Sequence, residues 1–172
     1  MFAAHDLDRR YQALIWGLPA NRADTIDAAL ARHPVDRKRQ AVQARGRHAV
    51  THYRTLRALP PFGCLIECQL ETGRTHQIRV HMAHIGHSVI GDPLYGKPKR
   101  AGQMPDTLSR DALSVLRSFP RQALHAASLS FVHPVSGLHI ELTSPLPSDM
   151  TVLLTRIEAA IAARARDVSF MA

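Results

Sequence analysis

The segment from Cys64 to Gly86 changes its hydrophobic period half-way along, and this change limits what the chain can fold into. Its first part alternates as a β-strand with one buried face does, through Cys64, Ile66, Cys68 and Leu70. Beyond a turn at Thr72 and Gly73, apolar residues recur at helical spacing, at Ile78, Met82 and Ile85. The segment predicts a strand followed by a helix, with Thr75 as the N-cap and Gly86 as the stop.

Arg79 stands out within this helix, because it lies between the apolar residues Ile78 and Val80. A guanidinium keeps its charge in proteins, so an arginine in a buried run has to face an anion. We therefore expect Arg79 to pair with a carboxylate or a phosphate.

Other stretches add strands and a second helix. Residues 9–17 alternate, as do residues 50–59, and a turn at 60–63 joins the latter to the Cys64 strand as an antiparallel neighbour. Residues 128–145 contain two strand candidates around a turn, and 148–163 have an amphipathic helical pattern. Clustered strands with few helices predict an α+β fold around a mostly antiparallel sheet. The length of 172 residues predicts a single domain, with a disordered tail at 164–172.

The chain carries a formal net charge of +8, which favours a polyanionic partner, usually nucleic acid; a merely soluble basic surface is the alternative. Six Lys and Arg residues lie between Arg32 and Arg47, in a segment predicted to be loop-rich, and a second basic segment spans 97–111. The sequence contains no long apolar run and no signal-peptide core near its start. It predicts a cytoplasmic protein that does not meet a membrane.

Several kinds of chemical site are disfavoured. The histidines at 76, 81, 84 and 87 have intervals of five, three and three, which do not suit a zinc site on a helix. Cys64 and Cys68 would lie on one face of a strand about 13 Å apart, so they are interpreted as core residues. No nucleophile motif or nucleotide-binding P-loop is present. The loop 72–75 before the helix suits an RNA phosphate, with Arg74 as an added charge.

The stretch LETGRTHQIRVHMAHIGHSVIGDPLYG resembles the hallmark segment of the RluA-type RNA pseudouridine synthases. The likeness continues in RRYQALIWGLP, in ARHPVDRKRQAV with GRHAVTHYRTL, and in RQALHAASLSFVHPVSG. It implies the catalytic-domain fold of that family, a mostly antiparallel mixed sheet with flanking helices. It also implies a cofactor-free isomerisation of uridine to pseudouridine in RNA, most simply 23S rRNA, with tRNA as the alternative, by a monomer.

The resemblance assigns roles to individual residues. Tyr11 matches the active-site tyrosine, Arg79 matches the arginine that pairs with the catalytic aspartate, and Ile78 and Val80 would line or support the pocket. Eleven residues are predicted to contact RNA: Arg37, Lys38, Arg39, Arg45, Arg47, Arg74, His76, Gln77, Lys97, Lys99 and Arg100.

The family's nucleophilic aspartate lies in an HRLDxxTSG-like loop that these 172 residues do not contain. Asp8, in His5-Asp6-Leu7-Asp8, is interpreted as a decoy, since it precedes Tyr11 by three residues, about 10 Å, and no TSG follows. We expect a C-terminal portion of a synthase, truncated at its N-terminus and inactive alone. Arg79 without its acid would cost about 3 to 5 kcal/mol of stability.

Two other functions stay open. One is an RNA-binding protein that has kept the scaffold and lost catalysis, which explains the charge equally well. The other is a metal-dependent hydrolase, which requires the histidines to converge.

Overall fold

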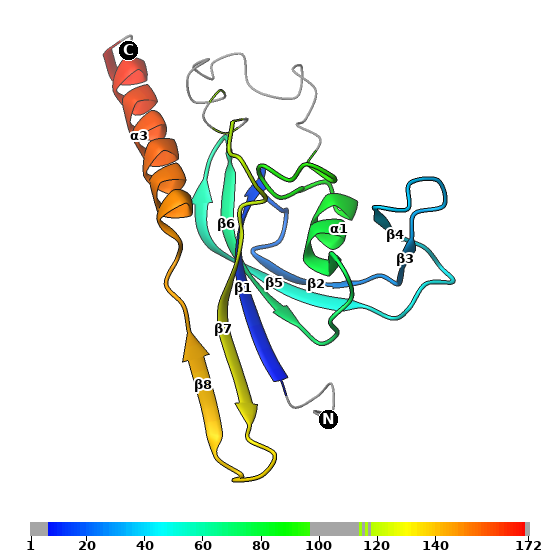
Figure 1. Ribbon diagram of the computed structural model, residues 1–172. Helices are drawn as coiled ribbons and strands as arrows, with labels where there is room; N and C mark the ends of the chain where they lie inside the picture. Colours follow the sequence, from blue (N-terminus) through cyan, green and yellow to red (C-terminus); the bar gives the residue numbers. More distant parts are fainter. Residues whose placement is uncertain (1–6, 97–113, 115, 117, 171–172) are drawn as a thin grey trace.

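The computed structural model describes residues 7–96, 114, 116 and 118–170, and the side chains of 164–170 are outside that description. A six-stranded sheet has the order β2-β5-β6-β1-β7-β8, and all of these neighbours are antiparallel. Its strands are β1 (Leu7–Trp16), β2 (Ala23–Asp27), β5 (Val50–Leu59), β6 (Gly63–Leu70), β7 (Leu124–Val132) and β8 (His139–Thr143). The remaining described elements are β3 (Leu30–Arg32), β4 (Gln40–Val42), α1 (Gln77–His84) and α3 (Ser148–Phe170). The α+β architecture predicted from the sequence is confirmed (Figure 1).

The register of the three central strands decides which side chains share a face. Tyr11 of β1 lies opposite Cys68 of β6, which lies opposite Tyr53 of β5. Since side chains alternate along a strand, these three residues point to one face of the sheet. Arg10, Gln69 and His52, each a neighbour in sequence of one of those residues, form the adjacent row on the other face.

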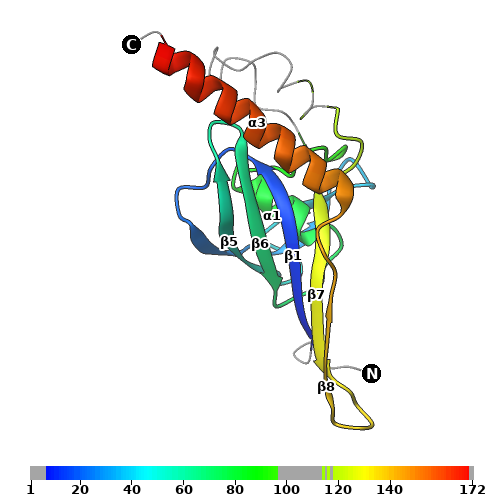
Figure 2. The same cartoon turned by 90° about the vertical axis from the view of Figure 1, so that its left-hand side faces the viewer.

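The two helices cover opposite faces of the sheet (Figure 2). On one face, α1 lies over β5, where His81 and Gln77 bond to the hydroxyl of Thr51. On the other face, α3 lies near β5, where Arg57 pairs with Glu158. Residues 13–16 of β1 are all buried, because the sheet is covered on both sides at that end.

The predicted helix after the Cys64 strand is present, although its start differs from the prediction. Its N-cap is His76, in the left-handed conformation with φ 58°, and not Thr75, and no side chain caps it. Gly86 follows the helix with φ 85°, the left-handed geometry that a C-terminal glycine provides. The stop was therefore correctly predicted.

The basic segment 26–50 is more ordered than the loop-rich excursion predicted. The edge strand β2 pairs with β5, and β3 pairs with β4 in a small separate hairpin. The pattern of β2 is mostly polar, with Ile26 as its only buried residue. The sequence missed it because an edge strand with one anchoring side chain has almost no hydrophobic period.

At the other end, α3 is described as helix as far as Phe170, whereas 164–172 was predicted to be a disordered tail. Residues 159–165 are mostly alanine and arginine, which are strong helix formers and let the helix continue beyond its packed face. Among the described helices, none is both long enough and apolar enough to cross a membrane.

Candidate active site and nucleic-acid interface

Tyr11 lies in the middle of the sheet, on the face that α1 covers. Its strand runs between β6 and β7, with Cys68 on one side and Ala126 on the other. The side chain is half-buried and packs against the main hydrophobic core. An aromatic ring in this position can form one wall of a pocket at the sheet surface.

Gln77 fastens α1 to this face. Its Nε2 donates to the carbonyl of Val50 at 2.9 Å and to the Thr51 hydroxyl at 3.1 Å. Its Oε1 accepts from the Thr72 hydroxyl at 2.8 Å and from the Arg74 amide at 3.0 Å. Only 2% of Gln77 is exposed, so its assignment as an RNA contact was wrong. The buried amide satisfies backbone groups of the strand and the loop instead.

His81 makes the second attachment of α1. Its two ring nitrogens bond to the Thr51 hydroxyl and to the carbonyl of Ala28, both at 2.9 Å. Burial lowers the pKa of this histidine, against a smaller opposite effect of the Ala28 hydrogen bond. A neutral ring with both nitrogens occupied serves the packing of α1.

Arg79 has a partner within the chain, and the partner is Asp92. Its Nε donates to Oδ2 and its Nη2 donates to Oδ1, both at 2.7 Å, and the two side chains are 9% and 0% exposed. The expectation that Arg79 would lack an acid, and would cost stability for that reason, was therefore wrong. Burial would raise the pKa of Asp92, but hydrogen bonds from Arg79, Tyr95 and Leu94 outweigh it and lower the pKa.

Tyr95 connects Arg79 to the basic hairpin. Its ring lies under two guanidinium groups, with the Cζ of Arg79 at 5.0 Å and that of Arg39 at 5.3 Å from its centroid. Its hydroxyl accepts from the Gln40 amide at 2.7 Å and shares a hydrogen bond with His76 Nδ1 at 3.0 Å. Burial, and then the charge of Arg79, lower the pKa of His76. The sequence did not identify Tyr95 or Asp92, although both lie in the turn-rich GDPLYG.

A basic groove of about 580 Å³ lies between the β3–β4 hairpin and the loop before α1. Five exposed cations line it, namely Arg32, Arg37, Lys38, Arg45 and Arg47. None of the five forms an ion pair with a residue that the structure describes. Thr75 completes the lining, and Arg74 nearby donates to the carbonyl of His48 at 3.0 Å. Four of the five were predicted RNA contacts; Arg32 was not.

Three more predicted contacts, Lys97, Lys99 and Arg100, lie outside the described residues.

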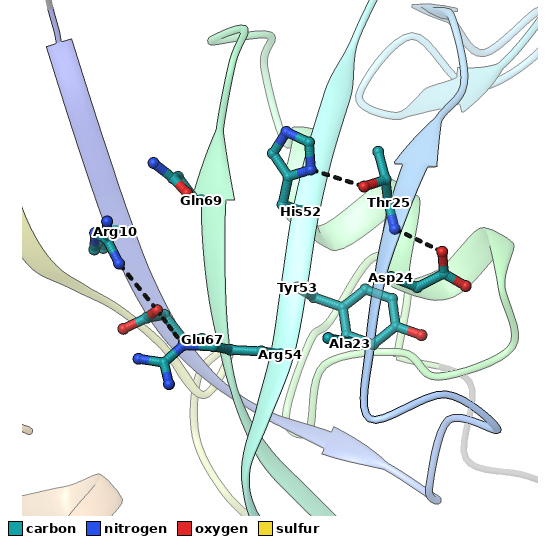
Figure 3. A pocket seen from close by; sticks show the side chains of 9 residues that line it. All are labelled: Arg10, Ala23, Asp24, Thr25, His52, Tyr53, Arg54, Glu67 and Gln69. Carbon is teal, nitrogen blue, oxygen red and sulfur yellow. Dashed lines mark hydrogen bonds and ion pairs between the residues drawn. The ribbon is translucent and has the colours of Figure 1, made fainter.

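The face of the sheet opposite to Tyr11 carries a different pocket, of about 420 Å³ (Figure 3). There Arg10 and Arg54 both reach Glu67, at 3.4 and 2.8 Å. Its charges are largely matched to one another, so it offers little to an anion.

Asp8 belongs to this opposite face. It lies within β1, whereas the predicted strand began at residue 9. Its carboxylate accepts from Arg10 Nε at 3.2 Å and from Gln69 at 2.9 Å. Both partners lie on the face that Tyr11 does not share. This placement agrees with the decoy interpretation, which stays a prediction.

Comparison with known proteins places the chain. A family model described as RNA pseudouridylate synthase matches residues 1–84. The chain is 47% identical over 154 residues to the ribosomal large subunit pseudouridine synthase D of Zymomonas mobilis subsp. mobilis, covering 88% of this chain and 45% of the relative. It is 44% identical to the protein of the same name from Escherichia coli strain K12, covering 90% and 46%. The chain belongs to the RluA-type RNA pseudouridine synthase family. It spans about half the length of these relatives.

Solved structures with the pseudouridine synthase fold agree with this membership. Human RNA pseudouridylate synthase domain containing 4 superposes with a TM-score of 0.66 at 25% identity, covering 88% of this chain and 62% of that one. The human domain containing 1 gives 0.62 at 22% identity, covering 90% and 67%, and supports the fold alone.

The remaining predicted residues of this synthase-family chain are core residues. Ile78 packs in the main core, while Val80 packs with Leu30 and Tyr95 in a smaller cluster, so both support the site from behind. Cys64 and Cys68 are buried and unbridged, and burial raises their thiol pKa values to about 11 and about 12. Within the described part of the chain, no three His, Cys, Asp or Glu side chains gather as a metal site requires.

Proposed function

We propose that this chain provides the tyrosine- and arginine-bearing part of a pseudouridine synthase that isomerises uridine in large-subunit ribosomal RNA. One observation carries the proposal: the loop before α1 borders both the basic groove, through Thr75, and the sheet face that holds Tyr11. RNA held in the groove by its phosphates would lie next to that face. Both relatives are named ribosomal large subunit pseudouridine synthase D, and this chain matches about half of their length. These two facts support the same assignment.

The chemistry requires a base outside its stack, and Tyr11 would provide a wall for it. The bond between C1′ and N1 breaks, the base turns, and C1′ bonds to C5. The hydrogen on C5 leaves as a proton, and N1 gains one, so the reaction needs no oxidant or cofactor. The nucleophilic carboxylate would come from an HRLD-type loop, which the 172 residues do not contain.

Arg79 can still hold that carboxylate while bonded to Asp92. The two hydrogen bonds to Asp92 use Nε and Nη2, and Nη1 forms no hydrogen bond with a described residue. Asp92 thus fixes the guanidinium plane, and Nη1 remains as a donor for a second acid. We propose that Asp92 orients Arg79 and that the catalytic aspartate binds to Nη1.

The test joins the part of the Zymomonas mobilis relative that precedes the matched region to this chain ahead of Leu7. Pseudouridine formation on a uridine-containing rRNA fragment is measured for the chimera, for the 172-residue chain and for its Asp8→Ala variant. We expect turnover only by the chimera, abolished there by Arg79→Ala and little changed by Asp8→Ala. Turnover by the 172-residue chain that disappears in Asp8→Ala would contradict the proposal.

A scaffold that binds RNA without catalysis is the second candidate, favoured by groove cations that form no ion pair with a described residue. In that case the chimera would bind rRNA and form no pseudouridine, although its thermal stability equals that of the 172-residue chain. Each phosphate contact adds about 0.7 to 0.9 to the slope of log affinity against log salt, so a flat salt dependence would contradict both candidates.

We propose further that the chain acts as a monomer in the cytoplasm and without metal. Its substrate would be rRNA, with tRNA as the alternative. Sedimentation of the purified protein, and competition between rRNA and tRNA fragments for the groove, test these points.

A further inference from the structure

Arg9 lies two residues before Tyr11 on β1, about 6.6 Å along the strand. Its neighbour Arg10 points to the opposite face, where it pairs with Asp8 and Glu67. Arg9 therefore shares the face of Tyr11, on the side where the loop before α1 begins.

The guanidinium of Arg9 lies against the backbone of Gly73. A Cβ added to Gly73 would be 2.5 Å from Nη1 and 3.3 Å from both Cζ and Nη2. With any other residue at 73 the guanidinium would have to move. The charge therefore lies at the loop, on the face of the sheet that carries Tyr11.

The hydrogen-bond donors of Arg9 nevertheless find no acceptor in the described part of the chain. Its Nε is buried without an acceptor, and the side chain forms no hydrogen bond or ion pair with any residue the structure describes. By contrast Arg10, Arg79 and Arg121 each pair with an aspartate. A half-buried guanidinium with unused donors is prepared for an anion that the described chain does not supply.

We propose that Arg9 binds the RNA phosphate that flanks the isomerised uridine. The inference rests on the proposed function, since a uridine at Tyr11 brings its own phosphates to this part of the sheet face. A guanidinium presents a planar fork that matches two phosphate oxygens. The basic groove would position the RNA strand, and Arg9 would bind the phosphate of the nucleotide that enters the site.

The experiment compares Arg9→Gln with Arg10→Gln in binding to a uridine-containing rRNA fragment across salt concentrations. The two variants lose the same charge at adjacent positions, on opposite faces. We expect Arg9→Gln to raise Kd about tenfold or more and to lower the salt slope by about 0.7 to 0.9. Arg10→Gln should leave the slope unchanged, and Arg9→Lys should restore most of it.

Gly73→Ala separates position from charge. The added methyl displaces the Arg9 guanidinium without removing it, so binding should weaken in the parent chain. In the Arg9→Gln background the same substitution should have little further effect, because the two changes act on one contact. Thermal unfolding of each variant checks that the fold is kept.

A scan of neutral methylphosphonate linkages along the RNA identifies the contact. A methylphosphonate at one position should weaken RNA binding by the parent chain. The same methylphosphonate should not weaken RNA binding by Arg9→Gln. Equal effects of Arg9→Gln and Arg10→Gln, or no linkage with that behaviour, would overturn the inference while RNA binding itself stands. Absence of RNA binding by the parent chain would overturn the proposed function together with this inference.

Discussion

Two arginine–aspartate pairs in this molecule have nearly the same geometry and very different surroundings. Arg79 meets Asp92 with N–O distances of 2.7 and 2.7 Å, and Arg121 meets Asp149 with 2.7 and 2.8 Å. The side chains of the first pair are 9% and 0% exposed, and those of the second are 37% and 40% exposed. Distance alone does not distinguish the two pairs.

The difference teaches that water, and not bond length, decides what such a pair contributes. A buried charge that loses its partner cannot be solvated, whereas an exposed charge is solvated in either case. Asp92 also accepts the amides of Leu94 and Tyr95 at 2.9 and 3.0 Å, so it organises a turn as well as a guanidinium. Asp149 accepts from the amide of Met150 and joins the start of α3 to Arg121, just before β7.

The largest effect is expected for Asp92→Ala. It leaves the Arg79 charge buried and removes the acceptor of two backbone amides, so unfolding free energy should fall by about 3 to 5 kcal/mol. Urea denaturation measures the loss, with Asp149→Ala as the matched control. A loss under about 1 kcal/mol would mean that Arg79 finds water, and the contrast between the pairs would fail.

A smaller loss, about 3 kcal/mol, is expected for Arg79→Met. Asp92 then keeps its two backbone amides and can take a proton, and the methionine fills part of the space. The double variant with Asp92→Asn should lose less than the sum of the single losses, because both changes remove one interaction. Strict additivity in denaturation would show that the two side chains do not act as a pair.

The next largest effect concerns the pKa values of the two carboxyl groups, Asp92 and Asp149. Both pKa values lie below the ordinary value; that of Asp92 is lowered despite its burial, and that of Asp149 is lowered mainly by Arg121. A lowered folded pKa gives stability that is full above the unfolded pKa near 4, and that is lost as pH falls through the folded value. NMR titration in about 1 M salt should move Asp149 toward its ordinary pKa and leave Asp92 unchanged. Equal movement of both would refute the difference in screening.

Asp149→Asn should have the smallest effect. The asparagine keeps an oxygen for Met150, and Arg121 remains solvated and still donates to the carbonyls of Gln122 and Leu124 at 3.0 and 3.3 Å. The denaturation midpoint should move far less than for Asp92→Asn under the same conditions. Shifts of equal size would show that the exposed pair is as important as the buried one.

The strands of the sheet centre, and the helix after them, could be predicted because their hydrophobic periods are local. Residues 9–17, 50–59 and 64–71 alternate, and the structure has β1, β5 and β6 there. β2 could not be predicted in this way, since its register on β5 supplies what its own side chains lack. Gln77 shows the same limit: a polar residue at a helix start suggests exposure, and only its acceptor at Val50 and its donor at Thr72 reveal that it is buried.

The sequence by itself determined that Arg79 needs an anion, because a guanidinium between buried neighbours cannot shed its charge. It also determined a basic segment around 32–47 and the resemblance to the RluA-type synthases, which the comparison with relatives confirms. Only the tertiary structure decided that Asp92 is that anion and that Tyr95 joins it to the hairpin. The structure alone also showed that Arg9 has no partner among the residues it describes. These facts depend on which residues the turns bring together, and a pairing across thirteen residues of turn and helix leaves no period in the sequence.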